Sequence, residues 1–336
     1  MLAVISQRSR KRDMFGKSLV SLVLSVGGIV LTQSPSRAGS SSALEQVQAE
    51  LRASLRLTSL PTNLHPATNK WSDLWKSDFG AVATGGGDSA CWDQSKSSTS
   101  LSKCVYGDRL AKRTLVLTGD SQAWMWEPAF DKWGRANQWK VIVLAKGLCP
   151  PWPDAQQEYL NNAAFPACAI FQSNVVKYID TTHPSVVVAD GLSPAIQTPT
   201  VARVKSDVKT FVTSIAPSKA RVLIVNPSPS FYAYDYSAHS TLSAPTCVVS
   251  HASQLRVCDI AKKLLLDYFM NLVINESHLP GSSQVLDLTQ LLCSKKCPMI
   301  ADGTLVYVDS DHVTYGWAVH VSGALGEILA PKLKGL

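Results

Sequence analysis

The sequence feature that most constrains the fold is a series of short apolar runs, bounded by turn residues and separated by segments with helical spacing. Five runs rich in Val, Ile and Leu are candidate strands: 114–118, 140–145, 185–189, 221–225 and 284–288. Segments with helical spacing lie between or after them: 123–136, 169–180, 200–215, 253–273 and a closing segment 315–329. Such runs are typical of parallel strands joined by crossover helices. The pattern predicts an α/β fold, a three-layer doubly wound sandwich with a mostly parallel five-stranded sheet.

Composition excludes several other classes of protein. The chain has 336 residues, of which 46% are apolar and 17% are charged, so disorder is not its dominant state. The net charge of +7 is concentrated at the N-terminus, because residues 1–17 hold five cations and one acid. Elsewhere no Lys/Arg cluster is interleaved with aromatic residues. We therefore expect no nucleic-acid partner.

The N-terminal segment has the pattern of an export signal. A basic stretch ends at Lys17, and the apolar run 19–31 follows within an uncharged segment. This run is short for a membrane-spanning helix, which needs ~20 apolar residues, and it suits the central region of a signal peptide. Residues 36–38 (SRA) offer a cleavage site. We expect residues 1–38 to be a signal peptide or, alternatively, an uncleaved membrane anchor, and either places the remaining chain outside the cytoplasm.

An exported chain with an even number of cysteines is expected to form disulfides. Neighbouring cysteines bracket loop-like stretches, so the placement favours pairing neighbour with neighbour. The four expected pairs are Cys91–Cys104, Cys149–Cys168, Cys247–Cys258 and Cys293–Cys297. A zinc site needs close pairs that face each other, and only Cys293 and Cys297 are close in sequence. We expect no metal, and no cofactor, because the sequence has no glycine-rich phosphate loop either.

Three segments follow from these patterns. Residues 1–38 form the targeting segment, residues 39–90 a helix with an extended linker, and residues 91–336 the α/β domain. The helix is indicated by apolar residues at helical intervals between Ala43 and Arg56.

Candidate catalytic residues follow two of the predicted strands. Folds of this class place their sites at the carboxyl ends of the strands. Ser121 follows the first strand in a Gly-Asp-Ser sequence and begins a helix, where backbone N–H groups can receive an oxyanion. Asp309 and His312 precede the last helix. Three residues apart, they can face the same way, so His312 can act as general base for a serine while Asp309 orients the imidazole. Taken alone, either motif could simply cap a helix.

Together these motifs resemble the SGNH (GDSL-like) hydrolase superfamily. The match is closest to the periplasmic SGNH domain that follows the acyltransferase-3 domain in bacterial O-antigen acetylase-like O-acyltransferases. The resemblance spans about residues 91–336. It rests on the segments 104–108 (CVYGD), 118–123 (TGDSQA), 146–150 (KGLCP), the 293–297 loop and 307–314 (YVDSDHVT).

Carried over, the resemblance implies that Ser121 is the nucleophile, His312 the base and Asp309 its orienting partner. The oxyanion would be held by the backbone N–H groups of Ser121 and Gly147. SGNH hydrolases carry G-x-N-D after the third strand, with an Asn that donates to the oxyanion, whereas this chain has 188–191 (VADG). Gln122 is a candidate substitute donor, with a helix-surface position as the alternative.

Other polar and aromatic residues are weaker candidates. We expect Asp309 rather than Asp311 to orient the base, since adjacency to His312 should point Asp311 elsewhere. The histidines without partner spacing are expected to be structural: His239, His251 and His320. Trp124 and Trp126 could line a sugar site, but are more simply explained as core residues.

The resemblance implies an exported enzyme that moves acyl groups to hydroxyls of a cell-envelope polysaccharide through an acyl-enzyme on Ser121. The acyl donor would come from a membrane acyltransferase-3 protein. A secreted SGNH esterase or deacetylase that acts on glycan or lipid esters needs only the same triad. A non-catalytic glycan-binding module would keep the fold without turnover, and the missing Asn supports that alternative.

Overall fold

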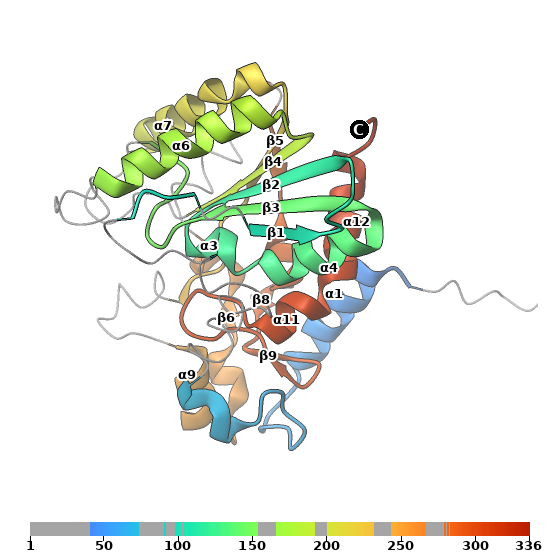
Figure 1. The fold of residues 1–336 in the computed structure, drawn as a ribbon. Helices are drawn as coiled ribbons and strands as arrows, with labels where there is room; N and C mark the ends of the chain where they lie inside the picture. Colours follow the sequence, from blue (N-terminus) through green and yellow to red (C-terminus); the bar gives the residue numbers. More distant parts are fainter. Residues whose placement is uncertain are drawn as a thin grey trace, which may run out of the picture. The chain divides into compact units, whose positions relative to one another are not determined.

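A computed structural model shows how the chain is arranged (Figure 1). It describes residues 41–73, 91, 98–101, 104–153, 166–191, 200–231, 243–266, 279, 281 and 283–336. Residues 41–336 form one compact unit. The predicted targeting segment 1–38 lies outside the described residues. No helix in the described part of the chain has the length and hydrophobicity that a membrane crossing requires.

The centre of the domain is a six-stranded sheet with the order β1-β3-β2-β4-β5-β7. Its strands are β1 (Cys104–Gly107), β2 (Arg113–Gly119), β3 (Trp139–Ala145), β4 (Val186–Asp190), β5 (Arg221–Val225) and β7 (Gln284–Leu286). Five strands of this sheet, β2, β3, β4, β5 and β7, run parallel. This confirms the five predicted strands and the doubly wound class. The sheet nevertheless has six strands rather than five, because β1 pairs antiparallel with β3 at the edge.

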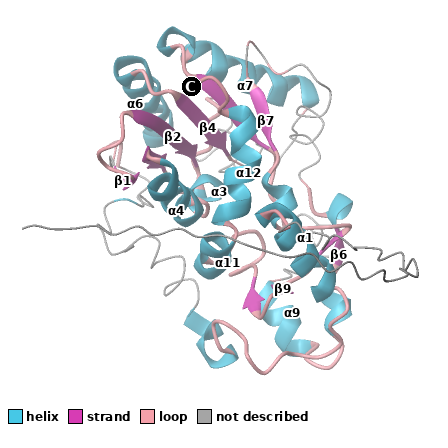
Figure 2. Cartoon of the chain, turned by 90° about the vertical axis from the view of Figure 1, so that its right-hand side faces the viewer, coloured by secondary structure: helices cyan, strands magenta, loops and turns pink. Residues whose placement is uncertain are grey.

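Helices cover both faces of the sheet, which makes the three predicted layers (Figures 1 and 2). One face packs on α6 (Pro166–Thr182) and α7 (Val201–Ser214), whose apolar residues share a core with Val116 and Val187. The opposite face shares its core with Leu115 and Leu117. The helices of that face are α3 (Ser121–Trp124), α4 (Glu127–Asn137), α11 (Tyr315–His320) and α12 (Ser322–Lys332).

The N-terminal helix α1 (Ala43–Ser54) packs on this second face. Its first turn is closed by a capping box of Ser42 and Glu45. The carboxylate of Glu327 in α12 accepts the backbone N–H groups of Ala43 at 2.7 Å and Leu44 at 3.0 Å. Because a carboxylate at a helix N-terminus satisfies groups that the helix itself cannot, this contact holds α1 on the domain.

The remaining elements are short. They are α9 (Ala244–Ser250), β6 (Ile260–Ala261), β8 (Lys296–Cys297), β9 (Ile300–Ala301), β10 (Thr304–Leu305) and the 3₁₀ turns η1 (Thr68–Asp73), η4 (Ala216–Ser218), η5 (Leu255–Cys258), η6 (Lys262–Leu264) and η7 (Leu288–Leu291). The helix predicted at 253–273 is therefore wrong over residues 253–266, and residues 267–273 lie outside the described residues. The Cys247–Cys258 disulfide and the pairing of β6 with β8 hold this stretch in turns.

Two further boundaries differ from the prediction. The helix predicted at 123–136 is two helices, α3 and α4, and the closing helix at 315–329 is divided into α11 and α12 at Val321. All four predicted disulfides are present: Cys91–Cys104, Cys149–Cys168, Cys247–Cys258 and Cys293–Cys297. Disulfides of this number are typical of proteins outside the cytoplasm.

The strand order fixes where a site can form. From β2 the chain adds β3 on one side and then returns past β2 to add β4 on the other. The carboxyl ends of β2 and β4 are therefore the point at which the strand order reverses, where doubly wound folds bind their ligands.

Candidate active site

The turn after β2 places Ser121 at this reversal point. Gly119 ends the strand with φ +150°, and a Cβ there would lie 1.6 Å from the carbonyl oxygen of Asp190. Asp120 caps α3 by accepting the backbone N–H of Gln122 at 2.8 Å. Ser121 is then the first residue of α3 and is partly exposed. The close approach of β2 and β4 thus requires glycine directly before the Asp-Ser pair.

The Asp-x-x-His segment forms a tight loop before α11. Its ends are joined because the backbone N–H of Val308 donates to the carbonyl of His312 at 2.8 Å. Inside the loop, Asp309 Oδ1 accepts the N–H groups of Asp311 at 2.9 Å and His312 at 2.8 Å. This backbone anchoring holds the carboxylate in place beside the imidazole.

The same carboxylate contacts the ring of His312. Asp309 Oδ2 lies 2.8 Å from Nδ1, and the His312 side chain is 10% exposed. A carboxylate at Nδ1 favours the tautomer that leaves Nε2 as the basic nitrogen, the arrangement used by Ser-His-Asp enzymes. The geometry agrees with the expected partnership of Asp309 and His312.

Asp311 does not point elsewhere, contrary to the sequence-based expectation. Its Oδ1 lies 3.1 Å from Nδ1 of His312, so two acids flank one nitrogen. The turn that Asp309 makes with the backbone curls the loop, and this curl brings Asp311 back toward the ring. The signal in the sequence was the pair of acids at alternate positions before His312.

These charges set the protonation of the pair. Burial lowers the pKa of His312, but the charges and hydrogen bonds of Asp311 and Asp309 outweigh it and raise the pKa above its usual value. Burial acts to raise the pKa of Asp309, and the hydrogen bond and charge of His312 reverse this, so its pKa is lowered. The loop therefore favours an imidazolium that is paired with a carboxylate.

Two contacts join the serine turn to the histidine loop. Gln122 Nε2 lies 3.3 Å from the carbonyl oxygen of Asp311 and 3.4 Å from its Oδ2. The N–H of Val313 donates to Met125 Sδ at 3.4 Å. The residues after Ser121 thus contact the residues on both sides of His312. Gln122 is 2% exposed, so it is not a helix-surface residue, and its amide serves this connection.

The turn after β3 borders the same edge. The N–H of Lys146 donates to the carbonyl of Gly119 at 3.0 Å, which ties this turn to the serine turn. Gly147 comes next and is partly buried, followed by Leu148 at φ 60°. The structure therefore brings Gly147 to the strand end that carries Ser121.

The end of β4 is acidic and dry. Asp190 is 1% exposed, and burial, followed by the charge of Asp120, raises the pKa of Asp190 well above its usual range. Gly191 packs against the next turn, because a Cβ there would lie 2.7 Å from Pro151 Cδ. In the sequence, this buried carboxyl group is indicated only by the position of Asp190 at the end of an otherwise apolar run. Residues 192–199 lie outside the described part of the chain.

The other candidates have structural surroundings. Trp124 and Trp126 are both 0% exposed, so they belong to the core. His251 Nδ1 lies 3.0 Å from the carbonyl of Cys247, and His320 stacks on the ring of Trp317. His239 lies outside the described residues.

Three groups of described residues bring possible metal ligands within 4.8 Å of one another: Cys247/His251/Cys258, Glu50/Asp302/His320 and Asp309/Asp311/His312. The two cysteines of the first group form a disulfide. In the second group, Glu50 and His320 already make a 2.7 Å ion pair. The third group is the histidine loop itself.

Comparisons with known proteins give the family and support the fold. The family model that describes an SGNH domain fused to AT3 domains matches residues 90–326. No curated protein sequence matches the chain. Among solved structures, the periplasmic domain of a lipopolysaccharide acetyltransferase from Salmonella ser. Paratyphi A aligns with a TM-score of 0.54. The alignment has 13% identity and covers 79% of this chain and 95% of that one, so it supports the fold.

Proposed function

Because the chain belongs to the family of SGNH domains that are fused to AT3 domains, we propose that it is an exported serine acyltransferase. Its acceptor is a hydroxyl group of a cell-envelope polysaccharide. The observation that carries the proposal is the contact between the Ser121 turn and the loop in which Asp309 holds His312. A serine and a carboxylate-bound histidine at one sheet edge are the parts that acyl transfer needs.

The proposed reaction has two steps on one serine. Ser121 Oγ attacks the acyl carbonyl and passes its proton to Nε2 of His312, while Asp309 stabilises the imidazolium. His312 then gives the proton to the leaving group, and the acyl group remains on Ser121 as an ester. In the second step His312 takes the proton of the acceptor hydroxyl, whose oxygen attacks this ester. The new ester leaves, and Ser121 recovers its proton from His312.

Negative charge develops on the carbonyl oxygen in both steps. The proposed donors are the backbone N–H groups of Ser121 and Gly147, which lie on neighbouring turns. One oxyanion donor is typically worth ~10²–10³ in turnover, so the lack of an Asn in 188–191 predicts slow attack by any weak nucleophile, water included. Gln122 supports the site by holding the two segments together.

The family also indicates the partner. Its members are fused to AT3 domains, so we propose that a membrane acyltransferase-3 protein supplies the acyl donor. The solved neighbour is named as part of a lipopolysaccharide acetyltransferase, which favours transfer over hydrolysis. In this proposal residues 1–38 direct or anchor the chain, residues 39–90 connect it, and residues 91–336 carry the reaction.

Hydrolysis is the second candidate, because the same Asp309–His312 pair can activate water. A glycan-binding module is the third, favoured by the β4 end that lacks an Asn. A fluorophosphonate probe separates enzyme from module. We expect labelling of the intact protein and none of Ser121→Ala, whereas an unlabelled wild-type protein would contradict both catalytic candidates.

A further inference from the structure

A groove lies beside the contact between α1 and the loop that carries the Cys293–Cys297 disulfide. Its volume of about 580 Å³ falls in the range of ~300–1,000 Å³ that is typical of ligand sites. The described lining residues come from α1, η6, η7 and the disulfide loop, and they include Leu44, Glu45, Gln48, Arg52, Lys262 and Lys295. None of these residues has a role in the proposed reaction.

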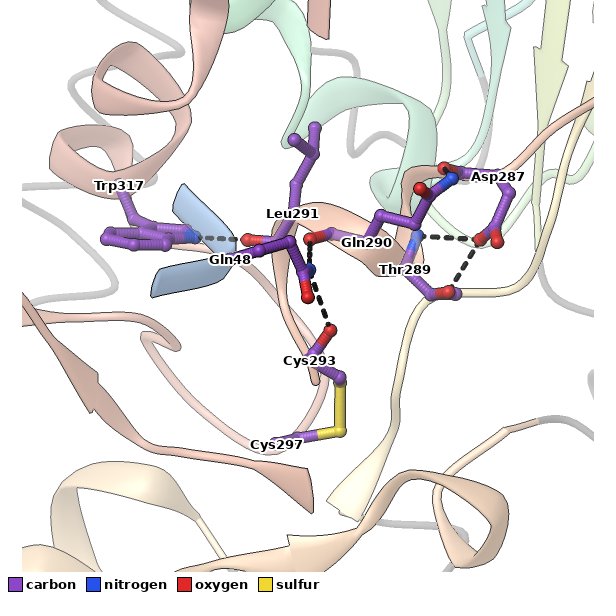
Figure 3. Close-up of a disulfide and its surroundings, with 8 residues drawn as sticks. All are labelled: Gln48, Asp287, Thr289, Gln290, Leu291, Cys293, Cys297 and Trp317. Carbon is purple, nitrogen blue, oxygen red and sulfur yellow. Dashed lines mark hydrogen bonds between the residues drawn. A yellow bond between two sulfur atoms is a disulfide. The ribbon is translucent and has the colours of Figure 1, made fainter. Parts of the chain in front are cut away.

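The wall of the groove is held in place by the side chain of Gln48 (Figure 3). Its Nε2 donates to the carbonyl of Cys293 at 3.1 Å and also to that of Gln290. Gln290 Nε2 in turn donates to the carbonyl of Asp287 at 3.2 Å. The disulfide closes the loop directly after these contacts. Such a wall is preorganised, so a ligand need not order it.

The groove carries an excess of positive charge. The backbone N–H of Lys262 donates to the carbonyl of Lys295 at 3.2 Å, which sets the two lysines side by side where β6 meets β8. Arg52 faces the same groove from α1. In the part of the chain that the structure describes, none of these three cations forms an ion pair.

Among the described residues of the lining, Glu45 is the one acid, and it also caps a helix. Glu45 accepts the N–H of Ser42 at 3.0 Å in the capping box of α1. The groove therefore offers cations to an oxygen-rich anion.

We propose that this groove binds the acidic groups of a polysaccharide, namely sugar carboxylates. This deepens the proposed function, on which it rests, by giving the acceptor a chemical class. A chain of sugars fits better than a membrane surface, because the site is concave and, among its described lining residues, Leu44 is the one large aliphatic side chain. Arg and Lys side chains pair with carboxylates, and the groove supplies three such cations: Arg52, Lys262 and Lys295.

The test measures binding of oligogalacturonate, a sugar chain with one carboxylate on each residue, to the full chain by titration calorimetry. Size-matched dextran is the neutral control. We expect oligogalacturonate to bind and dextran not to bind. The triple variant Arg52→Gln/Lys262→Gln/Lys295→Gln should weaken binding by roughly tenfold or more, since three ion pairs with the carboxylates are lost.

A matched variant controls for net charge. Lys177→Gln/Lys205→Gln/Lys209→Gln removes three exposed cations from α6 and α7, on the opposite layer, and should leave binding within about twofold. The proposed binding site would be overturned if both variants weakened binding equally. It would also be overturned if the groove variant bound as tightly as the wild type. Binding to phosphatidylglycerol vesicles but not to oligogalacturonate would overturn it in favour of a membrane contact. Fluorophosphonate labelling of Ser121 in the same variants tests the proposed reaction separately.

Discussion

Two neighbouring strands of this sheet, β2 and β4, end side by side and differ in what they carry. β2 ends in Gly119-Asp120-Ser121, which follows the SGNH pattern, and β4 ends in Asp190-Gly191, which departs from it. The register pairs Gly119 with Asp190, so the two ends pack against each other. The serine turn therefore depends on the backbone of the strand whose chemistry is unusual.

The comparison separates geometry from electrostatics. The close approach of the Asp190 carbonyl to Gly119 concerns only the backbone, and it holds whatever side chain residue 190 carries. The buried carboxyl group of Asp190 concerns charge, and its raised pKa keeps that charge low beside Asp120. Substitutions at each strand end should reveal this division.

Loss of the base should have the largest effect. His312→Ala should lower kcat/KM for a nitrophenyl ester by about 10⁴-fold or more, because Ser121 without a base is a weak nucleophile. The double variant with Ser121→Ala should be no worse than the worse single variant, because the two residues act as a unit. Additive losses in steady-state kinetics would contradict a shared mechanism.

Backbone packing predicts the next largest effect. Gly119→Ala should lower the free energy of unfolding by several kcal/mol, on the order of 3–5, because the added Cβ meets a backbone carbonyl. Gly191→Ala should cost about 1–2 kcal/mol, since its Cβ meets mainly proline side chains that can shift. Urea denaturation checks both, and equal losses would remove the distinction between the two strand ends.

The two acids of the histidine loop should separate in their pH dependence. Asp309→Asn should lower kcat by about 10³-fold through loss of orientation and charge support. Asp311→Asn should cost less but shift the rise of kcat/KM to lower pH, because Asp311 helps to raise the pKa of His312. In the wild type the rate should still climb in the alkaline range, since His312 must lose its proton to act as base. Identical pH profiles for the wild type and Asp311→Asn would refute this role.

The smallest expected effect is the change in thermal stability when the carboxyl group of Asp190 is removed. The folded pKa of Asp190 is raised above its unfolded value, so the folded state binds this proton more tightly. Its contribution to stability is present below the unfolded pKa of ~3.9 and is lost as pH rises through the folded pKa. Asp190→Asn should therefore raise Tm at pH 8 by a few degrees relative to wild type, and less at pH 4. A Tm changed equally at both pH values would contradict a raised pKa of Asp190 in the folded state.

Much of the sheet was predictable because buried parallel strands are continuous apolar runs. The same logic missed β1, which has only four residues and lies at the edge. It also extended a helix through 253–266, because helical spacing says nothing about the Cys247–Cys258 bridge that holds this stretch. Helical spacing of apolar residues indicates which side chains are buried, but a disulfide can hold the backbone in another conformation.

The candidate site was predictable where residues adjacent in sequence carry it. The Asp309–His312 contact follows from a spacing of three, and the structure shows it at 2.8 Å. The approach of Asp311 to the ring and the connection through Gln122 depend on how a loop curls and on contacts between distant segments. Spacing along the chain marks Asp311 as a second acid near His312, but it does not show that the loop turns this acid toward the ring or that Gln122 connects the two segments.

The most direct test of the account is the intact mass of the full chain after reaction with a nitrophenyl acetate. We expect a stoichiometric acetyl adduct that peptide mapping places on Ser121. It should be absent in Ser121→Ala and should discharge faster to an envelope polysaccharide than to water. An unlabelled protein, or an adduct that persists in Ser121→Ala, would contradict the account.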